Sequence, residues 1–469
     1  MKGEATIVAK GRRAFPYLKV ATLPALIIVV LLALGCATAP GGRGHICLPS
    51  ITSDGSGGAI VAYEVFENDD LRSTYVQRIG AGGHKLWGEK GVLLYTARGT
   101  TVCPKTLTDG SGGAIILWHA WQERREVLAQ RFDSKGLALW QEDGVPILPG
   151  PEVYCRKAIC DDSGGIIIYG SKKGKGYIKR IDSKGNFLWA KDTSSICSKA
   201  SHIAEMASDN SGGVIIILTS RFGTFAQRID SEGNILWGES GLQVCNYGTY
   251  KPGVISDSSG GAIIVWAHRE RTKEGQQISS IYTQRVGAEG NILWQQGGLC
   301  VCSSSQLPLG YPRIVSDGSG GAIITWMTHN DLYVQRLDPE GNVLWSEDGI
   351  RVQGSEGPQS SSYRVVADGS GGAIIVFEKR SGRVPERGKP IYAQRIDAEG
   401  RNCWGPNGVL VSPGYWGFTM PPVVSEDGLG GVIVSWTAGT PFYTGLTYIQ
   451  RINAEGERMW GDKGILLTP

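Results

Sequence analysis

The chain has 469 residues and a formal net charge of +3. Five basic residues and one acid lie within the first 35 residues, so the remainder carries about −1, and we predict no nucleic-acid partner. The 68 glycines and the lack of a 3.6-residue apolar period beyond this N-terminal segment exclude an all-α fold.

Residues 1–35 predict a lipoprotein-type signal peptide for export. A basic start is followed by Val20–Leu34, an apolar run of fifteen residues, which is shorter than the roughly 20 of a spanning helix. Leu34-Gly35-Cys36 resembles the lipobox of bacterial lipoproteins, and the resemblance implies cleavage before Cys36 and lipid attachment to it. Ala33 replaces a larger aliphatic residue, which leaves an uncleaved signal anchor open. We expect residues 36–44 to be a lipid-anchored tether, with the protein at the cell surface or the periplasmic side.

Residues 45–469 consist of eight versions of one unit of about fifty residues. Each unit has an aspartate before a glycine-rich turn, then an arginine, then a tryptophan nine residues after the arginine. The aspartates are Asp54, Asp109, Asp161, Asp209, Asp257, Asp317, Asp368 and Asp427; the arginines are Arg78, Arg131, Arg180, Arg228, Arg285, Arg336, Arg395 and Arg451; the tryptophans are Trp87, Trp140, Trp189, Trp237, Trp294, Trp345, Trp404 and Trp460. From aspartate to arginine the spacing varies between 19 and 28 residues, so that segment contains a variable loop.

The sixth unit shows the expected strands. Residues 313–316 and 322–326 flank a tight Asp-Gly-Ser-Gly-Gly turn, 333–337 form a third strand, and 343–345 begin a fourth. Four strands per unit predict an all-β fold, an eight-bladed β-propeller of four-stranded antiparallel blades over residues 45–469. No strand is plainly left over to pair across the closure, so we expect blade one to pack on blade eight, with a small clasp as the alternative.

The two ends of the propeller differ. Both tight turns lie at one end, whereas the second-to-third loops and the blade crossings, which hold all the length variation, lie at the other. Loops on a rigid frame carry recognition, so this variable end is the expected binding face. The candidate ligand-binding residues are Lys172, Lys173, Lys175, Tyr154, Tyr250, Tyr311, Tyr363 and Trp416. Gly170 and Leu218 replace an aromatic residue found in the other six units, and this gap predicts a cleft for an anionic or sugar-like ligand. Solvated loops and packed tyrosines are the alternative.

The repeated charged residues predict a structural role, because an active site occurs once and these groups occur eight times. We expect the aspartates to accept hydrogen bonds, some of them from the repeated arginines, and the tryptophans to pack between blades. No catalytic residue, metal site or cofactor is predicted.

Nine cysteines accompany Cys36, and six of them flank the blade crossings: Cys103, Cys155, Cys197, Cys245, Cys300 and Cys302. Export permits disulfides, and pairs between neighbouring crossings are expected, although the connectivity cannot be read.

Tyr392 to Glu399, Gly400 and Trp404 resemble the tryptophan-docking repeat of quinoprotein-type propellers, which have eight blades. The Gln-Arg pair departs from that repeat, and the quinone and calcium ligands of those enzymes map to no position here. The Ser316-Asp317 turn also resembles the sialidase Asp-box, Ser-x-Asp-x-Gly-x-x-Trp, but here serine directly precedes aspartate and the aromatic residue falls nine residues after it. Relatives of the first family include non-enzymatic scaffolds.

We therefore expect a membrane-tethered, extracytoplasmic, non-catalytic module that binds a protein, peptide or glycan. The alternative is a quinone-dependent dehydrogenase or a sugar hydrolase that uses the variable face.

Overall fold

The computed structural model describes residues 36–38, 45–68, 71–98, 102–120, 126–148, 150, 153–172, 175–200, 202–305, 308–328, 331–355, 363–379, 389–413, 421–438 and 446–468. The signal peptide expected at residues 1–35 and most of the tether lie outside this part. Among the described residues, no helix combines the length and hydropathy needed to cross a bilayer.

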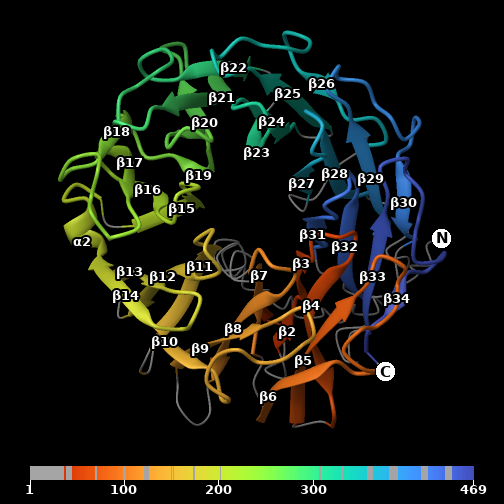
Figure 1. The fold of residues 1–469 in the computed structure, drawn as a ribbon. Coiled ribbons are helices and arrows are strands. Elements are labelled where there is room, and N and C mark those ends of the chain that lie inside the picture. Colours follow the sequence, from red (N-terminus) through yellow and green to blue (C-terminus); the bar gives the residue numbers. More distant parts are fainter. Residues whose placement is uncertain are drawn as a thin grey trace, which may run out of the picture.

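Eight four-stranded antiparallel sheets surround one axis, which confirms the expected eight-bladed β-propeller (Figure 1). Blades 1 to 4 are β3 (Ser50–Ser53), β4 (Ala59–Phe66), β5 (Leu71–Ile79), β6 (Val92–Arg98); β7 (Lys105–Thr108), β8 (Ala114–Ala120), β9 (Glu126–Phe132), β10 (Val145–Leu148); β11 (Val153–Cys160), β12 (Ile166–Lys172), β13 (Lys175–Ile181), β14 (Phe187–Asp192); and β15 (His202–Ser208), β16 (Val214–Ser220), β17 (Gly223–Ile229), β18 (Leu242–Cys245). Blades 5 to 8 are β19 (Tyr250–Ser256), β20 (Ala262–Arg271), β21 (Gln277–Val286), β22 (Leu299–Ser304); β23 (Gly310–Ser316), β24 (Ala322–Met327), β25 (Leu332–Leu337), β26 (Ile350–Arg351); β27 (Arg364–Ala367), β28 (Ala373–Glu378), β29 (Ile391–Ile396), β30 (Val409–Ser412); and β31 (Val423–Glu426), β32 (Val432–Ala438), β33 (Leu446–Ile452), β34 (Ile465–Leu466).

The strands within each blade pair in chain order, and the first strand is the innermost (Figure 1). The second strand is apolar along most of its length because it lies between two neighbouring sheets, so both of its faces are buried. The first strands surround the central channel, and their residues are mostly only partly buried. This arrangement puts the innermost strands, as well as the loops, within reach of a ligand in the channel.

Two further elements lie outside the regular blade pattern. β1 (Cys36–Thr38) and β2 (His45–Cys47) form a separate two-stranded sheet. A single helical turn, α2 (Thr193–Ile196), follows β14.

The fourth strand begins later than its sequence suggests. In blade 6 only an isolated bridge, Leu337 to Val343, joins the residues before Trp345 to the third strand, and β26 begins at Ile350. The side chain of Gln335 accounts for this displacement, since it accepts from the backbone N–H of Trp345 at 3.2 Å and donates to the carbonyl of Ser346 at 2.5 Å. The expectation that residues 343–345 start the fourth strand is therefore wrong for this blade.

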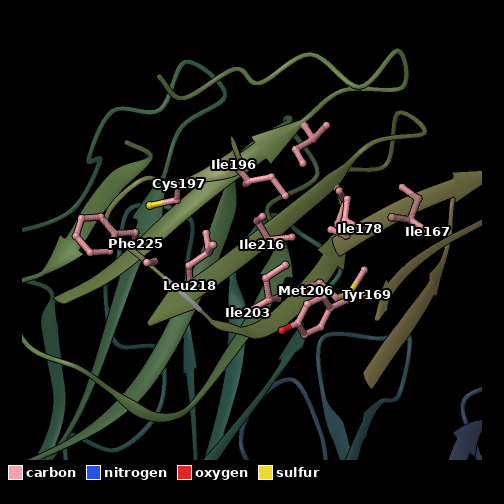
Figure 2. Close-up of a cluster of buried hydrophobic side chains, with 13 residues drawn as sticks. Ile167, Tyr169, Ile178, Ile196, Cys197, Ile203, Met206, Ile216, Leu218 and Phe225 are labelled. Carbon is pink, nitrogen blue, oxygen red and sulfur yellow. The ribbon is translucent and has the colours of Figure 1, made fainter. Parts of the chain in front are cut away.

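Blade 3 is the exception that supports this explanation. In seven blades a glutamine such as Gln335 precedes the repeated arginine, whereas Lys179 takes this position in blade 3. There β14 runs through Trp189 as a continuous strand paired with β13. The chain then forms α2, and Ile196 and Cys197 fill the seam between blades 3 and 4 (Figure 2). The glutamine thus decides whether the tryptophan lies in a loop or in the strand.

The ring closes without a shared strand among the described residues. Blade 1 is built entirely from β3 to β6 and blade 8 from β31 to β34, so no strand crosses between them. Ile51 and Val61 share a buried cluster with Ile433 and Ile449 across this seam. Closure therefore depends on the same contacts that join the other blades.

A tryptophan fastens each blade to the next. The indole N–H of Trp237 donates to the carbonyl of Ala288 in blade 5 at 2.8 Å. Gly290 lies against the same ring: its φ is +76°, and a Cβ there would come within 2.6 Å of Trp237 Cδ1. The acceptors in the eight seams are the carbonyls of Ser134, Ser183, Ser231, Ala288, Pro339, Ala398, Ala454 and Ala81. The expected packing of tryptophans between blades is confirmed.

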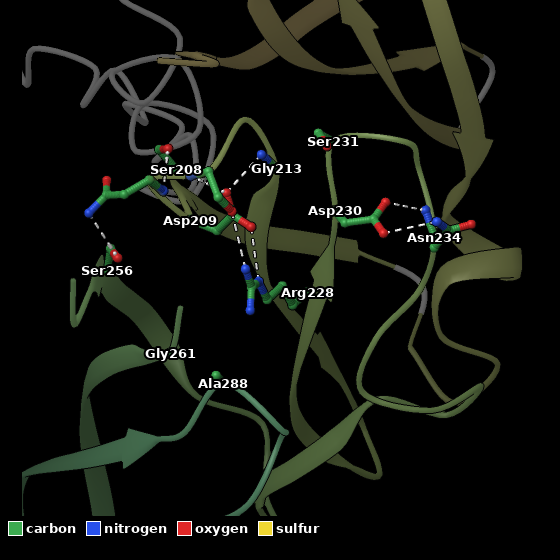
Figure 3. A network of polar contacts seen from close by, with 12 residues as sticks. Ser208, Asp209, Gly213, Arg228, Asp230, Ser231, Asn234, Ser256, Gly261 and Ala288 are labelled. Atoms are coloured by element: carbon green, nitrogen blue, oxygen red, sulfur yellow. Dashed lines mark hydrogen bonds and ion pairs between the residues drawn. The ribbon is translucent and has the colours of Figure 1, made fainter. Parts of the chain in front are cut away.

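An ion pair braces the turn end of each blade. In blade 4, Arg228 Nε lies 2.9 Å from Asp209 Oδ2, while Asp209 Oδ1 accepts from the backbone N–H groups of Ser211 and Gly213 (Figure 3). Burial acts to raise the pKa of Asp209, but these donors outweigh it and hold the pKa below its ordinary 3.8. The aspartate and arginine are paired in all eight blades. This constant end is scaffold, which leaves the other end and the channel for function.

Candidate anion-binding site in the channel

The loop lysines predicted as ligands lie on the surface. Lys172 and Lys175 are exposed and pair with each other at the tip of the β12–β13 hairpin. Lys173 and Trp416 lie outside the described residues, and Tyr250 begins β19 without a described side chain. Of these five side chains, the structure therefore places only those of Lys172 and Lys175, on the surface of this hairpin.

The cleft expected beside Gly170 is filled. A Cβ at Gly170 would lie 2.7 Å from Leu148 Cδ1 and 3.2 Å from Tyr177 Cε2. Leu218 is fully buried and packs in the cluster between blades 3 and 4 (Figure 2). The missing aromatic rings are thus replaced by neighbouring side chains, because a seam between sheets is packed to interior density.

Two of the predicted tyrosines meet in the channel wall. Tyr311 on β23 and Tyr363, immediately before β27, lie in one cluster between blades 6 and 7. The hydroxyl of the buried Tyr363 donates to the carbonyl of Tyr311 at 2.5 Å, and burial raises its pKa to about 12. Tyr363 is therefore a fixed structural group that stays protonated at neutral pH, and it cannot serve as a base there.

Three cations that the sequence analysis did not select accompany these tyrosines. Lys251 Nζ lies 4.7 Å from the ring centroid of Tyr311, and Arg313 Cζ lies 5.2 Å from that of Tyr363. Arg364 follows Tyr363 and donates to its carbonyl oxygen at 3.1 Å. We name Lys251, Arg313 and Arg364 the basic cluster; its members come from β19, β23 and β27, the first strands of three successive blades.

The two arginines of the basic cluster differ in their acidic partners. Glu378 is the acid that acts on Arg364, whereas Arg313 forms no ion pair with a described residue and its Nε is buried without a hydrogen-bond partner among them. Burial, followed by repulsion from Arg313, lowers the pKa of Arg364 to about 10. Burial, followed by the two arginines, also lowers the pKa of Lys251. Arg364 therefore remains charged at neutral pH, and an anion placed in the basic cluster would relieve the repulsion that lowers the pKa values of Arg364 and Lys251.

The backbone that carries the cluster is strained. Lys251 and Tyr311 have φ values of 48° and 53°, in the left-handed region that side-chain-bearing residues seldom adopt. They occupy the same position in successive blades, six residues before Asp257 and Asp317, where the first strand is irregularly paired with the second. The strain places the Lys251 ammonium against the Tyr311 ring. Strain of this kind accumulates at binding sites.

A simple signal in the sequence marks this site. The fourth residue before the repeated aspartate is Lys105, Lys157, Glu205, Arg313 or Arg364 in five blades, and is uncharged in the others. A strand that is buried on both faces rarely carries a charged residue, so charge at this position indicates a strand that faces the channel. The predicted binding residues came from the loops and therefore did not include this position.

Five of the six cysteines that flank the blade crossings do not form the expected disulfides. Cys155, Cys197, Cys245, Cys300 and Cys302 are free thiols, while Cys103 is disulfide-bonded. The Cys197 thiol instead donates to the carbonyl of Ser240 at 2.9 Å, within the packing of its own seam. In the part of the chain described, no group of three or more His, Cys, Asp or Glu side chains is placed to hold a metal ion.

Comparison with known proteins identifies no family: no protein family model and no curated protein matches the chain. Among solved structures, a puromycin hydrolase mutant is 14% identical with a TM-score of 0.37, and the match covers 90% of this chain and 62% of that one. Prolyl oligopeptidase B from Galerina marginata is 10% identical with a TM-score of 0.45, covering 78% of this chain and 50% of that one. Polysaccharide lyase Uly1 is 11% identical with a TM-score of 0.41, and the match covers 77% of this chain and 91% of that one. The chain spans about half to three fifths of the length of the first two, and such distant likeness concerns the fold alone.

Proposed function

We propose that this propeller is a non-catalytic binding module that takes an anionic ligand in its channel. The observation that carries the proposal is the basic cluster, in which three cations from neighbouring innermost strands lie close enough to act on one another. The rings of Tyr311 and Tyr363 hold Lys251 and Arg313 in place. Arginine in particular suits the recognition of carboxylate, sulfate or phosphate groups.

The surroundings of the cluster favour binding over catalysis. Acid–base hydrolysis of a sugar needs two carboxyl groups facing one bond, whereas the two glutamates near the described channel wall each interact with a cation: Glu205 pairs with Lys157, and Glu378 acts on Arg364. We further propose that the module works outside the cytoplasm, held at a membrane by Cys36. This part rests on the sequence of residues 1–36.

The test compares two double variants of the full-length chain purified in detergent. Calorimetric titration with dextran sulfate, and with neutral dextran as the matched ligand, should show binding of the charged polymer only. K251Q/R313Q should weaken that binding about tenfold or more, since charge-assisted hydrogen bonds contribute about 1.5–3 kcal/mol each.

The matched control, K172Q/K175Q, removes two exposed charges from the β12–β13 hairpin and should bind as the wild type does. The reverse result, with loss only in K172Q/K175Q, would show that the surface loop and not the channel binds anions. An unchanged melting temperature of K251Q/R313Q ensures that lost binding reflects lost charge. Equal binding of dextran and dextran sulfate would overturn the proposal.

A further inference from the structure

The channel wall as a whole is positively charged. The eight innermost strands, β3, β7, β11, β15, β19, β23, β27 and β31, carry six lysines and arginines and two glutamates. One glutamate, Glu205, is paired with Lys157, and the other, Glu426, directly precedes the Asp427 turn at the constant end. Positive charge is therefore concentrated on the wall of the channel, in a chain whose residues beyond position 35 carry about −1 in total.

Blades 2 and 3 provide a second group of cations. Arg156 donates from Nε to the Ser171 hydroxyl at 3.0 Å, and its Cζ lies 5.4 Å from the ring centroid of Tyr154. Lys105 donates to the carbonyls of Cys155 and Arg156 at 3.3 and 2.9 Å. Neither cation forms an ion pair with any described residue. As in the basic cluster, neutral groups and an aromatic ring hold the cations.

The two groups face each other across the channel. In a ring of eight blades, blade 2 lies opposite blade 6 and blade 3 opposite blade 7, and Figure 1 shows β7 across from β23 and β11 across from β27. Lys105 and Arg156 thus lie on the wall opposite Arg313 and Arg364. One small anion can contact only one wall at a time, whereas an extended molecule with several acidic groups can contact both.

We infer that the ligand is an acidic polysaccharide whose carboxylate or sulfate groups bind both walls of the channel, an inference that rests on the proposed function. Tyr154 is 38% exposed beside Arg156, and such a ring offers a flat apolar face to a sugar next to a cation for its acidic group. The inner edges of the first strands add backbone donors and acceptors that suit hydroxyl groups. The chain beyond position 35 carries about −1 in total, which does not fit the net basic charge typical of a nucleic-acid-binding protein.

The experiment measures affinity against ligand length. The probes are a trimer and a dodecamer of α-1,4-linked galacturonate, titrated into the full-length protein at low salt. The wild type should bind the dodecamer at least about tenfold more tightly than the trimer, because the second wall adds charge-assisted contacts. K105Q/R156Q should bind the trimer as the wild type does and lose most of the gain with length. R156Q alone, which keeps the hydrogen bonds from Lys105 to the backbone, should lose part of the gain in affinity from trimer to dodecamer.

Each outcome separates this inference from the proposed function. If K105Q/R156Q is folded by circular dichroism and keeps the whole gain with length, the second wall is not used and this inference fails, while anion binding at the basic cluster stands. If K251Q/R313Q binds the trimer as the wild type does, the proposed function itself fails. Equally tight binding of a poly-glutamate peptide of matched charge, or of single-stranded DNA, with the same dependence on Arg156 would overturn the assignment to a polysaccharide.

Discussion

The indole N–H of Trp460 donates to the carbonyl oxygen of Ala81 at 3.0 Å and so joins two residues 379 positions apart. Arg451, on the same blade, reaches the same carbonyl at 3.5 Å. This contact repeats the one found in every other seam, so the closing seam is a seam like the rest. The whole ring is held by eight equivalent contacts and not by a shared strand.

Replacing Trp460 by alanine should destabilise the protein as much as the same change at an internal seam. Loss of a buried tryptophan costs about 3–5 kcal/mol, whereas Trp460→Phe should cost about 1 kcal/mol, chiefly for the lost hydrogen bond. Urea unfolding of W460A and of W237A gives the loss in the free energy of unfolding at the closing seam and at an internal seam. A much smaller loss for W460A would show that closure depends on other contacts.

The glycine under each tryptophan should resist substitution more strongly than a glycine elsewhere with the same backbone shape. Gly456 has φ +90° and a Cβ there would lie 2.8 Å from Trp404, whereas Gly461 has φ +75° and open space around it. Gly461→Ala should cost about 1 kcal/mol for the backbone alone, and Gly456→Ala about 1–3 kcal/mol more for displacing the ring. Thermal unfolding of the two variants measures this difference in stability. Equal losses of stability would contradict the argument that Gly456 stacks on the Trp404 ring.

Asp209→Asn should be far more damaging than Asp230→Asn, although both change an aspartate in a turn of blade 4 (Figure 3). Asp209 is buried against Arg228, so the variant leaves that guanidinium without its carboxylate, a loss of about 3 kcal/mol. The partly buried Asp230 closes a surface turn with Asn234 and is not paired with a guanidinium, so its replacement should cost under about 1 kcal/mol. Denaturant midpoints that shift equally would refute the structural role of the repeated pair.

The glutamine before the arginine should be essential where it holds a loop. Gln227 donates to the carbonyl of Gly238 and accepts from the N–H of Trp237, and it is fully buried. Gln227→Ala should cost about 2 kcal/mol or more, since it leaves buried backbone groups unpaired. Lys179→Ala, at the equivalent place in blade 3, should be nearly neutral, because β14 needs no such support. Calorimetric melting of both variants checks this contrast.

The stability of the protein should fall in mild acid through His119. Burial, and then the charge of Lys105, lowers the pKa of His119 from 6.5 to about 4. Because the folded pKa lies below the unfolded one, protonation favours unfolding. The stabilisation is therefore complete above pH 6.5 and is lost as the pH falls toward 4, up to about 3 kcal/mol.

Urea unfolding at pH 7 and pH 5 compares the wild type with His119→Gln, which should lose stability less steeply. His84→Gln, a change at an exposed ring, serves as the matched control and should follow the wild type. An identical pH dependence in the wild type and H119Q would remove His119 as the cause.

The amino-acid sequence by itself determined the ring of eight blades, their internal ion pairs and the packing of tryptophans between them. These features are local and repeated, so eight copies of one pattern, with a constant nine residues from arginine to tryptophan, reveal them. The expectation that blade one packs on blade eight also came from the sequence, because each of the eight units supplies its own four strands. The sequence shows that the glutamine at the position of Gln335 recurs in seven of the eight units. Its effect on where the fourth strand begins became apparent only from the hydrogen bonds of its side chain.

Only the tertiary structure decided where the candidate site lies. Arg313 and Lys251 are 62 residues apart in the chain, and nothing local relates them. They meet because successive blades place their first strands side by side around the channel. The gap beside Gly170 shows the converse: a residue type that seemed to leave space did not, because Leu148 from the neighbouring blade fills it. Which space is filled between two blades depends on side chains from both blades. Charged residues on the inner strands come together only when the ring has closed.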